Sequence, residues 1–495
     1  MSEKTATGVS ILAAAFAAGV LGDYLLHGVP PGINVLSWAA VLVAVVLVTT
    51  RGQAVVSRRD DAAGALALIV FAADFAWRDS FALRLLDLGA LGIVVSLAAL
   101  RAPVSRLAIS GLAEYFKASV IACLRAALDP LALLFKDIRW AEAVRPGWPR
   151  QALRVTLGTA LAAPPLAIFL ALLMAADVVF RRIVVNTLSF NVMRLLGHIL
   201  FIGFLAWIVA GTLRGILFGN AKPAAESSSS RSGALGITEI GVALGLVDAL
   251  FLCFVVVELR YFFGGASLVK VVPGLTYAEY ARHGFFELCA VSALVSPLLL
   301  GAHWLLRPEK SAHERIFRGL AGLQTTLVFV IMLSAIERMR LYEHEYGLTE
   351  LRLYTTAFMG WLALVLVWFL LTVLRGHRER FAFGAMIAGL AGILILHVMN
   401  PDALIARRNI ARATGGRKFD AAYVASLSAD AVPTLIESLP ELKPADRSKI
   451  ACELRGRLSL TKPIDWRTWN LSRWQARRAF QRSEASLPNL YCACN

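Results

Sequence analysis

The sequence predicts an all-α protein, a polytopic bundle of about eleven transmembrane helices with a small helical C-terminal module. Hydrophobic residues make up 58% of the 495 residues, charged residues only 17%, and the mean hydropathy is +0.65. The apolar residues form runs of about 17–25 residues, which is long enough to cross a bilayer as a helix. Helices are expected because lipid offers no hydrogen-bonding partner to backbone N–H and C=O groups.

The predicted spans follow the apolar runs in chain order. They lie near residues 8–26, 33–50, 62–77, 81–100, 153–180, 195–218, 236–258, 284–306, 317–337, 352–374 and 381–399. The expected division is into N-terminal transmembrane helices at 1–100, cytoplasmic interfacial amphipathic helices at 101–152, a main transmembrane bundle at 153–399 and a polar helical tail at 400–495.

The charge distribution predicts the orientation. The net charge is +16, and Lys and Arg concentrate in alternate connections, as expected when the N-terminus is cytoplasmic. An odd number of spans then puts the tail on the outer side. No basic stripe interleaved with aromatic residues is present in a soluble segment, so nucleic-acid binding is not expected.

The last span ends at an Asn-Pro pair, Asn400-Pro401. Proline cannot continue a helix but fits the first turn of a new one, and asparagine is a good N-cap. We therefore predict a break at Asn400 and a new helix, "PDALIARRNIARAT", lying along the membrane surface with its arginines at the phosphates.

Ionisable residues inside the apolar spans are candidates for an intramembrane functional site, because a charge at bilayer depth is costly. These residues are Asp23, Arg84, Asp87, Asp248 and Glu287. Arg84 and Asp87 are three positions apart and are expected to pair with each other. Asp177 and Glu258 are explained by positions near span ends. Asp23 and Asp248 have no evident local partner and are the better functional candidates.

Proline and glycine predict local backbone features. Pro164 and Pro165 stand inside one span and predict a kinked or broken helix, which is more often a packing feature than a substrate site. Gly211, Gly215 and Gly219 recur every four residues, a spacing typical of close helix packing.

No motif predicts catalysis, a cofactor or a metal site. The chain has no GxSxG, HExxH, Walker or GxGxxG motif. His344 between Glu343 and Glu345 lacks a second histidine at ligand spacing, so a solvated loop is the expected interpretation. A membrane enzyme is the least favoured function class.

Three stretches resemble a known family: "ELRYFFGGASLVKVVPGLTYAEYARHGFFEL", "YGLTELRLYTTAFM", and "NPDALIARRNIARATGGRKFDAAYVASLSADAVPTL" followed by "WNLSRWQARRAF". They resemble the bacterial multi-pass membrane family of domain of unknown function 4173, which is related to the 4153 set. The residues carrying the resemblance are Tyr261, Gly264, Gly265, Thr276, Glu279, Tyr280, Arg282, Gly347, Thr349, Arg352, Asn400, Pro401, Asn409, Asp430 and Pro433. The resemblance implies a bacterial cytoplasmic-membrane protein and carries no activity.

Two function classes remain open. The first is a non-enzymatic envelope sensor, regulator or assembly scaffold, in contact with the lipid bilayer and with a protein partner through its C-terminal tail. The second is a secondary transporter or channel for a small solute, indicated by Pro164-Pro165 and by the buried Asp23 and Asp248.

Overall fold

The computed structural model describes most of the chain. The described residues are 2–50, 58–100, 112–143, 172–187, 190–218, 235–264, 285–306, 311–458 and 465–483, with isolated residues between 158 and 170. Within these ranges every regular element is a helix, and a single β-bridge joins Leu235 to Leu306. The predicted all-α fold class is confirmed.

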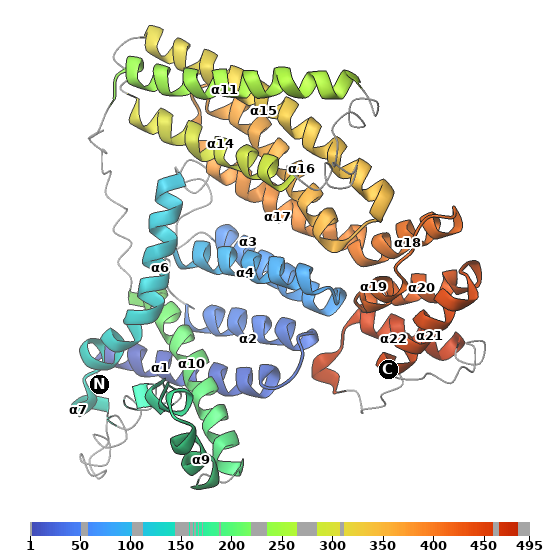
Figure 1. Cartoon of the computed structure of the whole chain (residues 1–495). Coiled ribbons are helices and arrows are strands. Elements are labelled where there is room, and N and C mark those ends of the chain that lie inside the picture. Colours follow the sequence, from blue (N-terminus) through green and yellow to red (C-terminus); the bar gives the residue numbers. More distant parts are fainter. Residues whose placement is uncertain are drawn as a thin grey trace.

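The N-terminal part is a group of helices at the lower and middle levels of Figure 1. Its helices are α1 (Glu3–Leu26), α2 (Ile33–Thr49), α3 (Arg58–Trp77), α4 (Phe81–Leu100), α6 (Leu112–Ala132), α7 (Trp140–Ala143), α9 (Val178–Thr187) and α10 (Phe190–Phe218). Ser2 begins α1 by accepting a hydrogen bond from the Thr5 amide, as expected of an N-cap serine.

Within residues 112–143, α6 packs along α10, and the predicted interfacial placement of this segment stays a prediction. The Trp207 indole donates to the Ala127 carbonyl at 3.0 Å, and Arg214 pairs with Asp129 at 2.9 Å. A Cβ atom on Gly211 would lie directly against the Ala126 carbonyl oxygen. Of the predicted packing glycines, Gly211 therefore makes the close approach, which the missing side chain permits.

The main bundle forms the upper part of Figure 1. It contains α11 (Ile237–Gly264), α14 (Phe285–Leu305), α15 (Ser311–Tyr346), α16 (Glu350–Thr372) and α17 (Phe381–Met399), around a core that includes Phe285, Phe317 and Phe369. Leu390, Ile393 and Leu394 of α17 also pack against α3 and α4, so α17 joins the two parts.

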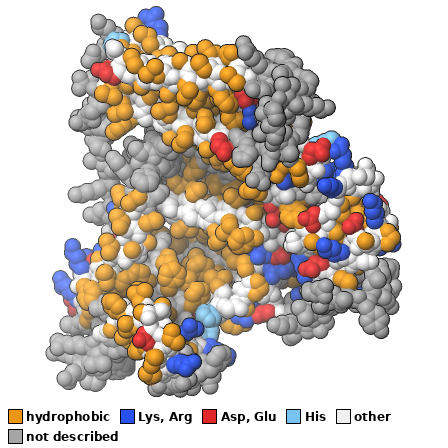
Figure 2. Space-filling model, viewed as in Figure 1, with side chains coloured by type: hydrophobic (Ala, Val, Ile, Leu, Met, Phe, Trp, Pro, Cys, Tyr) orange, Lys and Arg blue, Asp and Glu red, His pale blue; other side chains and the backbone are white. Residues whose placement is uncertain are grey.

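Seven helices are long and apolar enough to cross a membrane: α1, Met193–Phe218 of α10, Ile237–Glu258 of α11, α14, α15, α16 and α17. Two shorter apolar helices, Ile33–Thr49 and Ala62–Trp77, match further predicted spans. The predicted span at 153–180 lies largely outside the described residues. Hydrophobic side chains cover much of the visible surface of both helix groups (Figure 2). The chain is a multi-pass membrane protein whose apolar helices contact the bilayer.

The C-terminal part is a separate group of short helices beside the ends of α1–α4 and α17, where charged side chains gather (Figures 1 and 2). We call it the module. It consists of α18 (Pro401–Thr414), α19 (Ala421–Ser426), α20 (Val432–Ser438), α21 (Pro444–Leu458) and α22 (Leu471–Ser483). Its apolar core includes Ile405, Val424, Leu435 and Ile450.

The predicted break at Asn400 is present. Asn400 has φ = 53°, in the left-handed region that asparagine tolerates, and its side chain accepts a hydrogen bond from the Ala403 amide. The orientation of α18 differs from the prediction. Its apolar residues Ile405 and Ile410 are buried in the core of the module and do not lie on a membrane surface.

Candidate functional site

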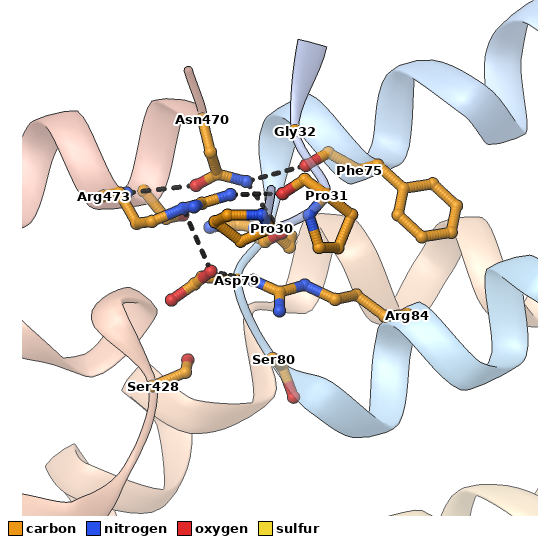
Figure 3. A network of polar contacts seen from close by, with 12 residues as sticks. Pro30, Pro31, Gly32, Phe75, Asp79, Ser80, Arg84, Ser428, Asn470 and Arg473 are labelled. Carbon is orange, nitrogen blue, oxygen red and sulfur yellow. Dashed lines mark hydrogen bonds and ion pairs between the residues drawn. The ribbon is translucent and has the colours of Figure 1, made fainter. Parts of the chain in front are cut away.

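The candidate site is the surface on which the module meets the membrane helices (Figure 3). We call it the junction. It is formed by the α1–α2 loop (28–32), the α3–α4 loop (78–80), residues 428–430 and residues 469–473 around the start of α22. The α3–α4 loop is only three residues long. The end of α3 and the start of α4 therefore lie next to each other, and both contact the module.

Asp430 is the centre of the junction. Its carboxylate accepts hydrogen bonds from the backbone amides of Asp79 at 2.7 Å and Ser80 at 3.0 Å, from a segment 351 residues away along the chain. The Asp430 side chain is only 1% exposed. An anion held by the free amides at the start of α4 is favoured by hydrogen bonding and by the helix dipole. Asp430 thus binds the backbone at the start of α4 from within the module.

Further donors surround the same carboxylate. The Ser428 hydroxyl lies 3.0 Å from it, the Arg78 guanidinium lies 3.5 Å away, and the Ser472 hydroxyl lies between this carboxylate and the Trp77 carbonyl. These contacts balance the buried charge, which would otherwise be strongly destabilising. They also occupy the carboxylate, which favours a structural role over a catalytic one.

Asn470 joins the module to the other side of the α3–α4 loop. Its side-chain amide donates to the carbonyls of Phe75 at 2.8 Å and Arg78 at 2.9 Å, which are the free carbonyls at the end of α3. Its oxygen accepts the Arg473 amide at 3.0 Å and so caps α22. Asn470 is 1% exposed, and one side chain therefore ends one helix and begins another.

Arginines complete the junction, as Figure 3 shows. Arg473 lies 3.2 Å from the Asp79 carboxylate and also donates to the Pro31 carbonyl. Arg84 pairs with the same Asp79 carboxylate. Asp79 therefore links a module arginine to a membrane-helix arginine.

The α1–α2 loop contacts the module through its backbone. The Ile33 amide donates to the Trp469 carbonyl at 2.9 Å. A Cβ atom on Gly32 would lie 2.6 Å from that carbonyl oxygen, so the approach requires glycine.

A second contact holds the module to the main bundle at the α15–α16 turn. The Asn409 side chain donates to the Leu348 carbonyl at 2.7 Å and accepts the Leu348 amide at 2.9 Å. Gly347, at φ = 81°, leaves room for it. Arg352 donates to the Gly347 carbonyl and stacks on Tyr342 at 4.1 Å. Asn409, Gly347 and Arg352 were all part of the family resemblance.

Asp402, in the first turn of α18, lies between these two contacts and is fully buried. Its carboxylate accepts the Ser428 amide at 3.2 Å. The pKa of Asp402 is raised from 3.8 to about 6, mainly by burial and in part by the nearby Glu350 and Asp430 carboxylates, while the Ser428 hydrogen bond lowers it. Burial likewise raises the pKa of Tyr423, whose hydroxyl accepts the Glu350 amide, to about 12.

A buried group of ionisable residues lies just beneath the junction. His397 of α17 is 3.2 Å from the Asp87 carboxylate of α4, and Asp74 of α3 lies beside them. Arg78 donates to the His397 carbonyl at 2.8 Å. The predicted Arg84–Asp87 pair is wrong, because Arg84 pairs with Asp79 and Asp87 with His397. Tertiary partners outweigh the helical spacing here.

The other predicted residues are dispersed. Asp23 has local and distant partners, contrary to expectation, with His198 at 2.8 Å and His27 at 3.4 Å. Asp248 is buried without a hydrogen-bond partner among the described residues. Glu258 binds the Ser334 hydroxyl at 2.6 Å and pairs with Arg338. Glu287 is exposed in the first turn of α14.

Several predictions fall outside the described residues. These are the side chain of Tyr261 and the residues Gly265, Thr276, Glu279, Tyr280, Arg282 and Pro164, while Gly264 is the last residue of α11. Pro165 is one of the isolated described residues, so the predicted break there stays a prediction. Thr349 and Pro433 stand at the starts of α16 and α20.

Sequence reasoning missed Arg78, His397 and Asn470. His397 stands inside an apolar helix, a position where a polar residue is costly, and that signal was available. Asn470 and Arg78 act on backbone groups of other segments, and such contacts have no sequence pattern.

Comparison with known proteins supplies the family. A family model described as Domain of unknown function (DUF4153) matches residues 65–438, a range that contains α4, the main bundle and Asp430. No curated protein and no solved structure matches the chain. Because the match covers more than half of the sequence, the chain belongs to the family of Domain of unknown function (DUF4153).

Proposed function

We propose that the protein is a non-enzymatic membrane regulator or scaffold, in which the junction holds the module in place for a protein partner. The observation that carries this proposal is the buried Asp430 carboxylate, which belongs to the module and binds the backbone amides at the start of α4. Movement of α3 relative to α4 would change the donors of Asp430, so the junction couples the membrane helices to the module.

The loops that the module contacts support a common side of the membrane. The α1–α2 loop, the α3–α4 loop and the α15–α16 turn all bind the module, and the predicted topology puts all three on the outer side. This agreement supports an extracytoplasmic module in a bacterial cytoplasmic membrane, with a cytoplasmic N-terminus. The narrower resemblance to domain of unknown function 4173 belongs to the same proposal.

A hollow in the module offers a surface for a partner. It has a volume of about 320 Å³ and is lined by basic and acidic side chains, among them Arg417, Lys418, Lys443 and Asp446. It supports contact with a polar protein surface.

Complementation of a deletion strain tests the proposal. Asp430→Ala and truncation after Gly416 are expected to abolish the phenotype that the intact gene restores, while Asp23→Asn and Asp248→Asn preserve it. Glu437→Ala, at an exposed position of α20, is the control. Full activity of the truncated protein at normal membrane levels would contradict the proposal.

A secondary transporter or channel is the second candidate, and Asp248 favours it. The α11 and α15 helices run in parallel, because Gly241 lies near Leu320 and Glu258 binds Ser334. Asp248 therefore lies at about the level of Gln324.

The α14 helix runs the opposite way and adds Ser296 at this level, since the His303 and Phe317 rings lie 5.1 Å apart. Asp248, Gln324 and Ser296 are 4%, 0% and 7% exposed, and each has side-chain atoms without a hydrogen-bond partner among the described residues. A layer of buried polar side chains inside a bundle of membrane helices is typical of a solute or ion path. Loss of complementation in Asp248→Asn, with the truncation still active, would favour this candidate.

A further inference from the structure

A second group of polar side chains, beneath the junction, has the composition of a metal site. Asp74, Asp87 and His397 come from α3, α4 and α17 and are 4%, 1% and 0% exposed. One potential ligand atom from each lies within 4.8 Å of the others. Asp74 and Asp87 come from two consecutive helices joined by a short loop, whereas His397 is distant in the sequence and is brought to them by the packing of α17.

The hydrogen bonding of these residues is incomplete. Asp74 Oδ2 and Asp87 Oδ1 have no hydrogen-bond partner among the described residues, while Asp87 Oδ2 and His397 Nε2 lie 3.2 Å apart as an ion pair without good hydrogen-bond geometry. Buried polar atoms are almost always paired in folded proteins. Two unpaired carboxylate oxygens beside this ion pair, all in one buried group, indicate that the group binds something besides the chain.

The imidazole is oriented as in a metal site. Its Nδ1 lies 3.0 Å from the Ile393 carbonyl oxygen, and a carbonyl can only accept, so Nδ1 carries a hydrogen. Nε2 lies 3.2 Å from Asp87 Oδ2, a separation that suits two ligands of one ion as well as an imidazolium–carboxylate ion pair. Metal-bound histidines commonly donate their other ring N–H to a backbone carbonyl in this manner.

The charge of the group calls for a cation. Two carboxylates meet in the protein interior beside one imidazole, His397, which faces Asp87, and the arginines nearest in the sequence are engaged elsewhere. Arg78 binds the His397 carbonyl and Asp430, and Arg84 pairs with Asp79. A divalent ion between the two carboxylates would balance their charge, which is otherwise costly to bury.

We propose that Asp74, Asp87 and His397 bind one divalent first-row transition-metal ion. Two carboxylate oxygens and one imidazole nitrogen form a mixed donor set suited to Zn²⁺ or Mn²⁺, with a further position for water. The ion links α3, α4 and α17 one helical turn beneath the module. The proposal depends on this group alone and not on the proposed regulatory function.

Metal binding to the purified full-length protein tests the proposal. Asp23, His27 and His198 form a second group with ligand atoms within the same distance, so all samples carry His27→Gln and His198→Gln to remove its histidines. After treatment with a chelator and its removal, ZnCl₂ or MnCl₂ is added. The bound metal is measured by elemental analysis and the affinity by calorimetric titration.

The expected result is one ion per chain for Zn²⁺ or Mn²⁺, with affinity at least tenfold lower in Asp87→Asn and in Asp74→Asn. Each aspartate-to-asparagine change preserves shape, and size-exclusion chromatography verifies that each variant is folded. If the folded protein that carries only His27→Gln and His198→Gln takes up neither ion, the proposal is overturned, and a proton on His397 balances the charge of the group instead. Uptake that neither asparagine variant changes also overturns it, because the ion is then bound elsewhere.

Discussion

Replacement of Asp402 by asparagine tests the electrostatics of the module. Asp402 is fully buried, and its pKa is raised from 3.8 to about 6, first by burial. Between these two pH values the folded state binds more protons than the unfolded state. The free energy of unfolding of the wild-type protein therefore falls as the pH rises through this window and is constant, for this group, above it. Asparagine has no charge to bury and removes this dependence.

The size of the effect follows from the pKa. At 1.36 kcal/mol for each pKa unit, the rise corresponds to about 3 kcal/mol at neutral pH. Asparagine retains the oxygen that accepts the Ser428 amide. We therefore expect Asp402→Asn to be more stable than the wild type above pH 6 by up to this amount, and close to it below pH 4.

The measurement is thermal unfolding of the full-length protein in detergent at several pH values between 4 and 7.5. The difference in thermal stability between variant and wild type is determined at each pH, so that the contributions of other titrating groups cancel. Asp446→Asn, at a partly exposed position of α21, controls for the loss of one negative charge. A difference that does not change with pH would refute the assigned burial of the Asp402 charge.

Two further substitutions test the contacts that hold the module. Gly32→Ala is expected to separate the α1–α2 loop from Trp469, because the new methyl group would lie 2.6 Å from the Trp469 carbonyl oxygen. Faster proteolysis of the module would show this separation. Gly28→Ala is the comparison for backbone strain alone, because Gly28 has φ = 68° and its new methyl group would meet no neighbouring atom. Asn409→Ala is expected to destabilise the contact with the α15–α16 turn by about 1–3 kcal/mol, since it leaves both polar groups of Leu348 unpaired. Unchanged protease resistance at the α15–α16 turn in Asn409→Ala would contradict this.

The sequence predicted those features whose causes are local. The helix break at Asn400-Pro401 depends on one residue that cannot continue a helix and one that caps the next, and both effects act within a few residues. The membrane spans depend on the length of apolar runs, and seven of the predicted spans match helices of sufficient length and hydropathy.

The junction could not be predicted in the same manner. Asp430 was noticed only through the family resemblance, because its partners are backbone amides of a distant loop. Arg84 and Asp87 have the spacing of a helical pair, yet each has a partner from another turn or helix. Such pairings depend on how helices pack, which the local pattern does not contain.

Hydrogen–deuterium exchange at the amides of Asp79 and Ser80 tests the central claim most directly, namely that Asp430 joins the module to the α3–α4 loop. Removing one member of a buried charged contact costs about 3–5 kcal/mol, so Asp430→Ala should accelerate exchange at these amides by about a hundredfold or more. Glu437→Ala should leave the rates unchanged. Equal exchange at Asp79 and Ser80 in the wild type and in Asp430→Ala would contradict the account.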